Sequence, residues 1–212
     1  MVRPLIAIPS PREIPDFIEA TAKIPCDKLW IKWHKEREAY RVMRKLFLSA
    51  KYDYLCILPD DLIATPNDYE TLLKDVEEFD YPVLAGTCNL RYNDDRYITA
   101  KQVVNPWMMP AALYTKEELF SGERIKRVAF DGFAFTFIRK DVVKKIEFHS
   151  TRYMTTAFDN AFALECQNRG IPIHVDTSVR MLHLGARLGL GIQENWGVGI
   201  KKPTVVFEEY SK

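Results

Sequence analysis

The 212-residue sequence has few cysteines, and none of them are closely paired. Cys26, Cys56, Cys88 and Cys166 lie far apart, each among apolar residues. Zinc ribbons and small disulfide scaffolds carry closely spaced cysteine pairs, so both classes are excluded. We expect the four cysteines to be core thiols of a protein in a reducing compartment.

Net charge and long apolar runs are also lacking. Thirty basic and 29 acidic side chains give a net charge of +1, which excludes a bulk attraction for nucleic acid or an anionic membrane. The run Leu5–Ile8 is too short for a signal-peptide core, and no run approaches the length of a membrane span. We therefore expect a cytoplasmic protein with no transmembrane segment and no nucleic-acid partner.

What is present is an ordinary globular composition, with 47% hydrophobic and 28% charged residues and no repeat or linker. In the first half, predicted strands alternate with helices of amphipathic period, the third helix being capped by Thr65 with Pro66 at its first position. The alternation predicts an α/β fold, a single domain with a mostly parallel central sheet and helices on both faces. The expected strands are 5–8, 28–33, 55–58 and 81–86, and the expected helices begin at 14, 34 and 65.

The second half has no such regular order. Residues 88–127 read as loops with at most a hairpin, and 128–138 as a strand pair or a strand kinked at Gly132. Helices are expected over 140–146 and 156–169, and a strand over 171–176 leads to 181–185. We divide the domain into a nucleotide-binding half (1–87), an acceptor and catalytic half (88–185) and a mobile glycine-rich tail (186–212).

The most informative segment is Tyr54–Asp61, an apolar strand that ends on two adjacent carboxylates, Asp60 and Asp61. Open α/β sheets bind ligands at the carboxyl ends of their strands, so the pair predicts a metal or a charged substrate. The alternative is that the two acids end the strand and solvate a turn.

Four segments in this order resemble a family 2 type glycosyltransferase of the GT-A fold, in the nucleotide-diphospho-sugar transferase superfamily. The first two resemble the family's opening strand and its strand ending in an Asp-x-Asp metal motif. The third is similar to its glycine-bearing strand near the donor sugar, and the fourth to its acidic helix with the following strand and metal-binding histidine. They are 4–10, 52–62, 130–139 and 157–185.

The resemblance implies a divalent cation held by Asp61 and His183. Mixed carboxylate and imidazole ligands suit Mn²⁺ or Mg²⁺, which would neutralise the diphosphate leaving group. The sequence departs from the family because Pro59 replaces the first Asp of the motif. His183 has an alternative reading as an ordinary histidine packed beside the sheet.

The resemblance also implies that Asp159 is the base that deprotonates an acceptor hydroxyl in an inverting transfer. The family's Glu-Asp pair is Phe158-Asp159 here, and an acid in a helix's first turn can have a purely structural role. A retaining transfer, which keeps the anomeric configuration of the sugar, remains an alternative to an inverting one. Arginine forks suit phosphate oxygens, so arginines join the donor-binding residues expected around the site. These are Pro9, Ser10, Arg12, Asp60, Asp131, Gly132 and Arg187.

The expected function is metal-dependent transfer of a sugar from a nucleoside diphosphate sugar to a glycan, protein or small-molecule acceptor that the sequence does not identify. One alternative is a sugar nucleotidyltransferase, which calls for a glycine-rich phosphate loop that Pro9–Arg12 lacks. The other is a non-catalytic nucleotide- or carbohydrate-binding protein of the same fold, which the departures at Pro59 and Phe158 favour.

Overall fold

The computed structural model describes residues 2–90, 93–102, 112–148, 158–184 and 201–211. The strands are β1 (Pro4–Ser10), β2 (Lys28–Lys32), β3 (Tyr54–Ile57), β4 (Leu62–Ile63), β5 (Val83–Leu90), β6 (Asn93–Ala100), β7 (Leu113–Thr115), β8 (Ile125–Val128), β9 (Thr136–Arg139), β10 (Ile173–His183) and β11 (Thr204–Glu208). The helices are α1 (Pro15–Ala22), α2 (Glu36–Ser49), α3 (Pro66–Phe79), α4 (Lys116–Phe120), α5 (Lys140–Lys145) and α6 (Phe158–Asn168).

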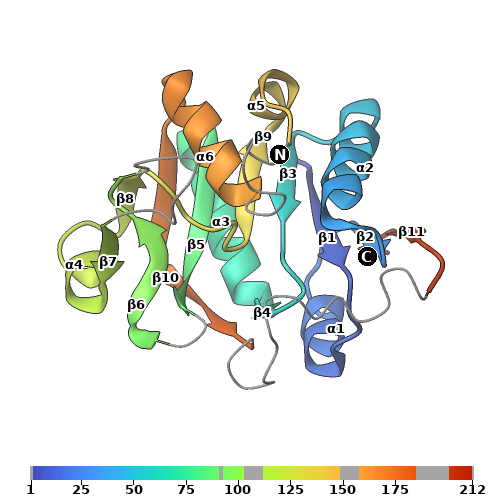
Figure 1. Ribbon diagram of the computed structural model, residues 1–212, viewed down its shortest axis with the longest axis horizontal. Helices are drawn as coiled ribbons and strands as arrows, with labels where there is room; N and C mark the ends of the chain where they lie inside the picture. Colours follow the sequence, from blue (N-terminus) through green and yellow to red (C-terminus); the bar gives the residue numbers. More distant parts are fainter. Residues whose placement is uncertain (1, 91–92, 103–111, 149–157, 185–200, 212) are drawn as a thin grey trace.

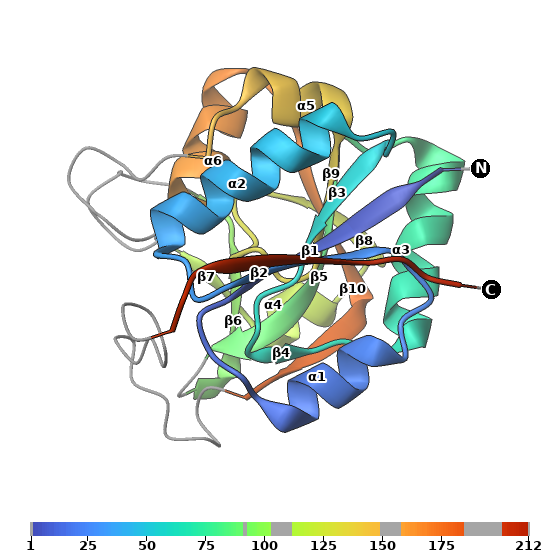
Figure 2. The ribbon, with the colours of Figure 1, turned by 90° about the vertical axis from the view of Figure 1, so that its right-hand side faces the viewer.

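The helices cover both faces of the central sheet, as the sequence predicts (Figures 1 and 2). Helices α2, α5 and α6 lie over one face, and α1 and α3 over the other. Alternate residues of the buried strands supply the two apolar layers: Leu5 and Ala7 of β1 face the first layer, and Ile6 and Ile8 the second. The α/β class is therefore confirmed.

The sheet is mixed, and this corrects the mostly parallel sheet expected from the sequence. Its order is β11-β2-β1-β3-β9-β5-β10-β4, with parallel pairing of β1 with β2 and β3 and of β5 with β10. Strand β9 lies antiparallel between β3 and β5. The chain leaves β5 at the edge where the parallel strands end and enters β9 from that same edge, so β9 must run the opposite way (Figure 1).

The segment expected to be irregular, 88–127, contains β6, β7, α4 and β8 in its described part. A capping box at Thr115 and Glu118 begins α4, in which each side chain pairs with the other residue's backbone N–H. The predicted strand pair over 128–138 is instead the end of β8, a tight turn and β9. In that turn Gly132, Phe133 and Phe135 all have positive φ, at 66°, 56° and 51°.

The C-terminal region differs from the predicted mobile tail. Strand β11 pairs antiparallel with β2 at the sheet's edge, and its Glu208 carboxylate accepts hydrogen bonds from Lys28 Nζ (3.3 Å) and Trp30 Nε1 (3.1 Å). Lys28 is 1% exposed, so Glu208 supplies the counter-charge that its buried ammonium requires. Residues 186–200 of the predicted tail lie outside the described residues.

All four cysteines are buried and free, which confirms that they are core thiols. Burial raises the pKa of the Cys26 thiol to about 11, so this thiol stays protonated at neutral pH. Within the described ranges, no helix combines the length and the apolar character needed to span a bilayer.

Candidate functional site

The acidic pair lies at the carboxyl edge of the sheet, where the chain turns from β3 into β4. Strand β4 pairs antiparallel with the end of β10, with His183 opposite Leu62, and Leu184 N donates to the Asp61 carbonyl at 2.7 Å. This pairing places His183 Nε2 3.5 Å from Asp61 Oδ2. The structure thus brings together the two residues predicted as metal ligands, which are far apart in sequence.

Arg12, from the loop after β1, fills the other side of the acidic pair. Its Nε and backbone N donate to Asp60 Oδ2 at 3.2 and 3.3 Å, and its Nη2 donates to Asp60 Oδ1. The same Nη2 lies 3.5 Å from Asp61 Oδ2. Burial raises the pKa of Asp60 to about 6 despite the guanidinium, because removal of water from the carboxylate outweighs the attraction of Arg12.

Pro9 and Ser10 end β1 beside this ion pair. Pro9 pairs with Ile31 in the sheet, and the buried Ser10 hydroxyl donates to the Arg12 carbonyl at 2.6 Å. Ser10 therefore fixes the loop that carries Arg12. Its predicted contact with the donor stays a prediction, and the predicted Arg187 lies outside the described residues.

Asp131 and Gly132 form the turn before β9. Asp131 is buried and accepts hydrogen bonds from Thr136 Oγ1 at 2.8 Å and Phe133 N at 3.2 Å. Burial raises the pKa of Asp131 to about 6, with a smaller contribution from the negative charge of Asp159. The negative charge in the first turn of α6 therefore acts on the acid in the turn before β9.

Gly132 makes a close approach that a side chain would block. A Cβ built on it would lie 2.4 Å from Ile98 Cγ1 of β6, and its φ of 66° is one that L-residues rarely adopt. We expect Gly132→Ala to lower the free energy of unfolding by about 2 kcal/mol, since backbone strain and overpacking add. Urea unfolding of the purified variant measures this loss.

The matched control is Gly122→Ala. Gly122 has a similar φ of 76° but no heavy atom within 4 Å of the built Cβ, so this variant incurs the backbone cost alone. Equal losses in the two variants would contradict a packing role for Gly132. Ile98→Ala in the Gly132→Ala background should restore part of the difference.

Asp159 occupies the first turn of α6, as predicted, and is partly exposed. Its Oδ1 accepts from the neighbouring Asn160 N at 2.8 Å. Desolvation raises the pKa of Asp159, because the loss of water disfavours its charged form. A carboxylate with a raised pKa is a stronger base than an ordinary Asp, and its partial exposure leaves it reachable by a substrate.

Glu36 and Tyr40 also belong to this region, although no motif in the sequence points to them as site residues. The Tyr40 ring stacks on Phe158 with centroids 4.9 Å apart, which joins α2 to the start of α6. Desolvation, and then the charge of Asp159, raises the pKa of Glu36 although much of its surface is exposed. In sequence, Glu36 looks like any acid that favours a helix start, so only the packing of two helices reveals it.

The residues present are compatible with a divalent cation. The carboxylate of Asp61 and the imidazole of His183 converge, and His183 Nδ1 is buried with no hydrogen-bond partner among the described residues. No third His, Cys, Asp or Glu completes a cluster in the part of the chain that is described. Mg²⁺ and Mn²⁺ sites of this type take remaining ligands from water and substrate phosphates, so two protein ligands are sufficient.

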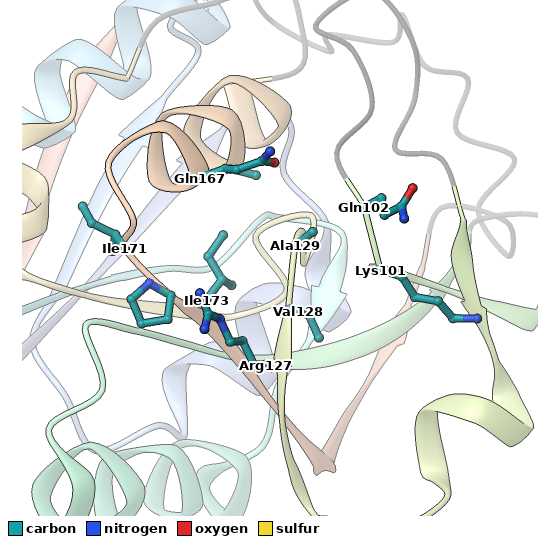
Figure 3. Close-up of a pocket in the computed structure, with 10 residues that line it drawn as sticks. Lys101, Gln102, Arg127, Val128, Ala129, Gln167, Ile171 and Ile173 are labelled. Carbon is teal, nitrogen blue, oxygen red and sulfur yellow. The ribbon is translucent and has the colours of Figure 1, made fainter.

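A cavity of about 590 Å³ lies beside α6, and no predicted site residue that the structure describes lines it (Figure 3). Arg127, Lys101 and the amides of Gln102 and Gln167 surround it. Ala163 and Gln167 are one and two helical turns beyond Asp159, on the same side of α6. The cavity therefore lies beside the same helix, α6, whose first turn carries Asp159.

No protein-family model matches the sequence, and no curated protein matches it as a relative. Among solved structures, A197 from STIV is similar with a TM-score of 0.61 and 19% identity, over 86% of this chain and 85% of that one. The fold is thus GT-A-like, an α/β single domain with a mixed central sheet. At this identity the likeness concerns the fold alone.

Two further structures are less similar. TarS 1-349 from S. aureus has a TM-score of 0.48 and 10% identity, over 85% of this chain and 59% of that one, so this chain spans less than two thirds of its length. CMP:2-keto-3-deoxy-manno-octonic acid synthetase complexed with CTP has a TM-score of 0.45 and 15% identity, over 84% and 90%. These scores are too low to establish a common fold.

Proposed function

We propose that this protein is a glycosyltransferase that moves a sugar from a nucleoside diphosphate sugar to an acceptor hydroxyl. The observation that carries the proposal is the convergence of the acidic pair, Arg12 and His183 at the carboxyl edge of a GT-A-like sheet. Ligands of open α/β sheets bind at this edge. The smaller contribution of the Asp159 charge to the raised pKa of Asp131 supports a second group of acids that includes both residues.

In this proposal each group has a separate role. Asp61 and His183 would hold a Mg²⁺ or Mn²⁺ ion, whose positive charge would stabilise the diphosphate leaving group. Asp159 accepts the proton of the attacking hydroxyl, and its raised pKa suits a base that works near neutral pH. Asp131 and the close-packed Gly132 form the surface of the site between the metal ligands and Asp159.

The acceptor is proposed to bind in the cavity beside α6. Arg127 and the amides of Gln102 and Gln167 offer hydrogen-bond donors around this cavity (Figure 3). Such a lining suits a polyhydroxylated or anionic acceptor, because guanidinium and amide groups bind hydroxyl, carboxylate and phosphate oxygens.

The first experiment is thermal unfolding with nucleoside diphosphates and their sugar conjugates, each with Mn²⁺, Mg²⁺ or chelator. A ligand at 100 times its dissociation constant stabilises the folded state by about 2.7 kcal/mol. We expect a metal-dependent stabilisation by one nucleotide that is lost in Asp61→Ala. The control is Asp53→Ala, at the opposite end of β3, which should keep it. No stabilisation by any compound would exclude the proposal.

The products distinguish the two alternatives of the same fold. A glycosyltransferase releases a nucleoside diphosphate, whereas a nucleotidyltransferase consumes a nucleoside triphosphate and a sugar phosphate and releases pyrophosphate. Nucleotide binding with neither product would support a non-catalytic binding protein.

A further inference from the structure

Arg12 forms ion pairs with both carboxylates of the acidic pair and is only 9% exposed. Its guanidinium bonds both oxygens of Asp60 and approaches Asp61 Oδ2 to 3.5 Å. The same oxygen lies 3.5 Å from His183 Nε2. A divalent cation bound to Asp61 and His183 would therefore compete with the Arg12 guanidinium for Asp61 Oδ2.

We propose that Arg12 is a tethered counter-ion that a divalent cation displaces from Asp61, and that the displaced guanidinium then binds the diphosphate of the donor. This inference rests on the proposed function for the identity of the diphosphate. The competition between Arg12 and the cation for Asp61 does not depend on that function.

The local structure allows the guanidinium to move while the backbone stays in place. The Arg12 backbone is held at two points, by its N–H to Asp60 and by its carbonyl to the Ser10 hydroxyl. Neither contact involves the guanidinium. The arginine side chain is long and its planar fork binds two phosphate oxygens as well as two carboxylate oxygens, so a diphosphate is a chemically equivalent partner.

Competition predicts effects of opposite sign on two ligands. Loss of the Arg12 charge removes the guanidinium that faces Asp60 and Asp61 in the wild type, so the affinity for Mn²⁺ should rise by about tenfold or more. The same change removes a phosphate ligand, so the affinity for inorganic pyrophosphate in the presence of Mn²⁺ should fall by about tenfold. A residue that only supported the loop would weaken both ligands when replaced.

The experiment measures free Mn²⁺ by electron paramagnetic resonance, without nucleotide, in wild type and Arg12→Gln. Arg139→Gln is the control for net charge, because Arg139 also bridges two carboxylates, Asp80 and Asp141, at a different place in the fold. Adding Asp61→Asn to Arg12→Gln should abolish the tighter Mn²⁺ binding. Pyrophosphate binding is then measured by calorimetry at saturating Mn²⁺.

Unchanged or weaker Mn²⁺ binding in Arg12→Gln would overturn the inference. Tighter binding that persists after Asp61→Asn is added would overturn it as well. Arg12→Gln leaves the buried Asp60 unpaired, so Arg12→Gln/Asp60→Asn, which removes both charges, serves if the single variant does not fold. It should still bind Mn²⁺ more tightly than wild type because Asp61 no longer faces the guanidinium, although the gain is smaller since the charge of Asp60 is also lost. Opposite changes in Mn²⁺ and pyrophosphate affinity, without binding of any nucleotide sugar, would support the counter-ion and reject the glycosyltransferase.

Discussion

Asp159→Asn is expected to lower turnover by about 10²- to 10⁴-fold while donor binding stays unchanged. The amide keeps the size of the side chain and an oxygen for the Asn160 N–H, but it cannot accept the acceptor's proton. Turnover is measured with the donor found by thermal unfolding, and donor affinity by the shift that donor produces. Only a base role separates the two measurements in this way.

The pH dependence gives this prediction a second readout. The base must be ionised, and desolvation raises the pKa of Asp159 above that of an ordinary Asp. Activity should therefore fall as the pH decreases through that raised pKa, at a higher pH than an unperturbed Asp value of about 3.9 allows. In Asp159→Asn this limb of the profile should disappear from the residual activity.

The matched control is Asp141→Asn, because Asp141 also lies in the first turn of a helix, α5. Its hydrogen bond with Arg139 lowers the pKa of Asp141 to about 2, as expected for an acid with a purely structural role. This variant should alter stability and leave turnover intact. If both variants behaved alike, Asp159 would be a structural acid of α6.

The first half of the fold follows from the sequence because its signals are local. Apolar runs, helical periods and the Thr65 cap each depend on neighbouring residues, and β1, β2, β3 and α3 lie where these signals predict them. The direction of β9 has no local signal. It depends on the edge at which the chain returns after residue 100, and a strand of either direction carries the same apolar pattern.

In the candidate site, too, some features follow from local sequence signals and others depend on contacts between distant residues. The position of Asp60 and Asp61 follows from the strand before them, whereas the pairing of Asp61 with His183 entered through a resemblance that the geometry now supports. The contact of Arg12 with Asp60 joins residues 48 positions apart, so no local pattern in the sequence shows it, and the predicted contact of Arg12 with the donor stays a prediction. An arginine after a strand has the same sequence signature whether its partner is a phosphate or a carboxylate.

The largest stability effect is expected at Arg124, which the sequence analysis did not single out. Its Nη1 and Nη2 bind the two oxygens of Asp75 in α3 at 3.0 and 2.7 Å, and Nη1 also binds Asp176 Oδ2 of β10 at 2.6 Å. The side chains of Asp75 and Asp176 are 3% and 0% exposed. One guanidinium thus compensates two buried acids and ties a helix to the sheet.

We expect Arg124→Ala to lower the free energy of unfolding at pH 7 by about 3 kcal/mol, because two buried carboxylates lose the guanidinium with which both form ion pairs. The outer face of Arg124 is hydrated, which keeps the loss below that of a fully buried pair. Burial already raises the pKa of Asp176, so in the variant the loss should shrink as the pH falls and this acid is protonated in the folded state. Urea unfolding at pH 5 and pH 7 measures both effects.

Arg139→Ala is the appropriate comparison, since Arg139 also bridges two acids, Asp80 and Asp141, but these are 75% and 42% exposed. Water replaces the guanidinium at exposed carboxylates, so we expect this variant to lose less than about 1 kcal/mol and to show little change between the two pH values. The difference between the two arginine variants isolates the cost of leaving buried acids without a cation. Similar losses for Arg124→Ala and Arg139→Ala would mean that Arg124 acts through packing of its stem rather than through its charge.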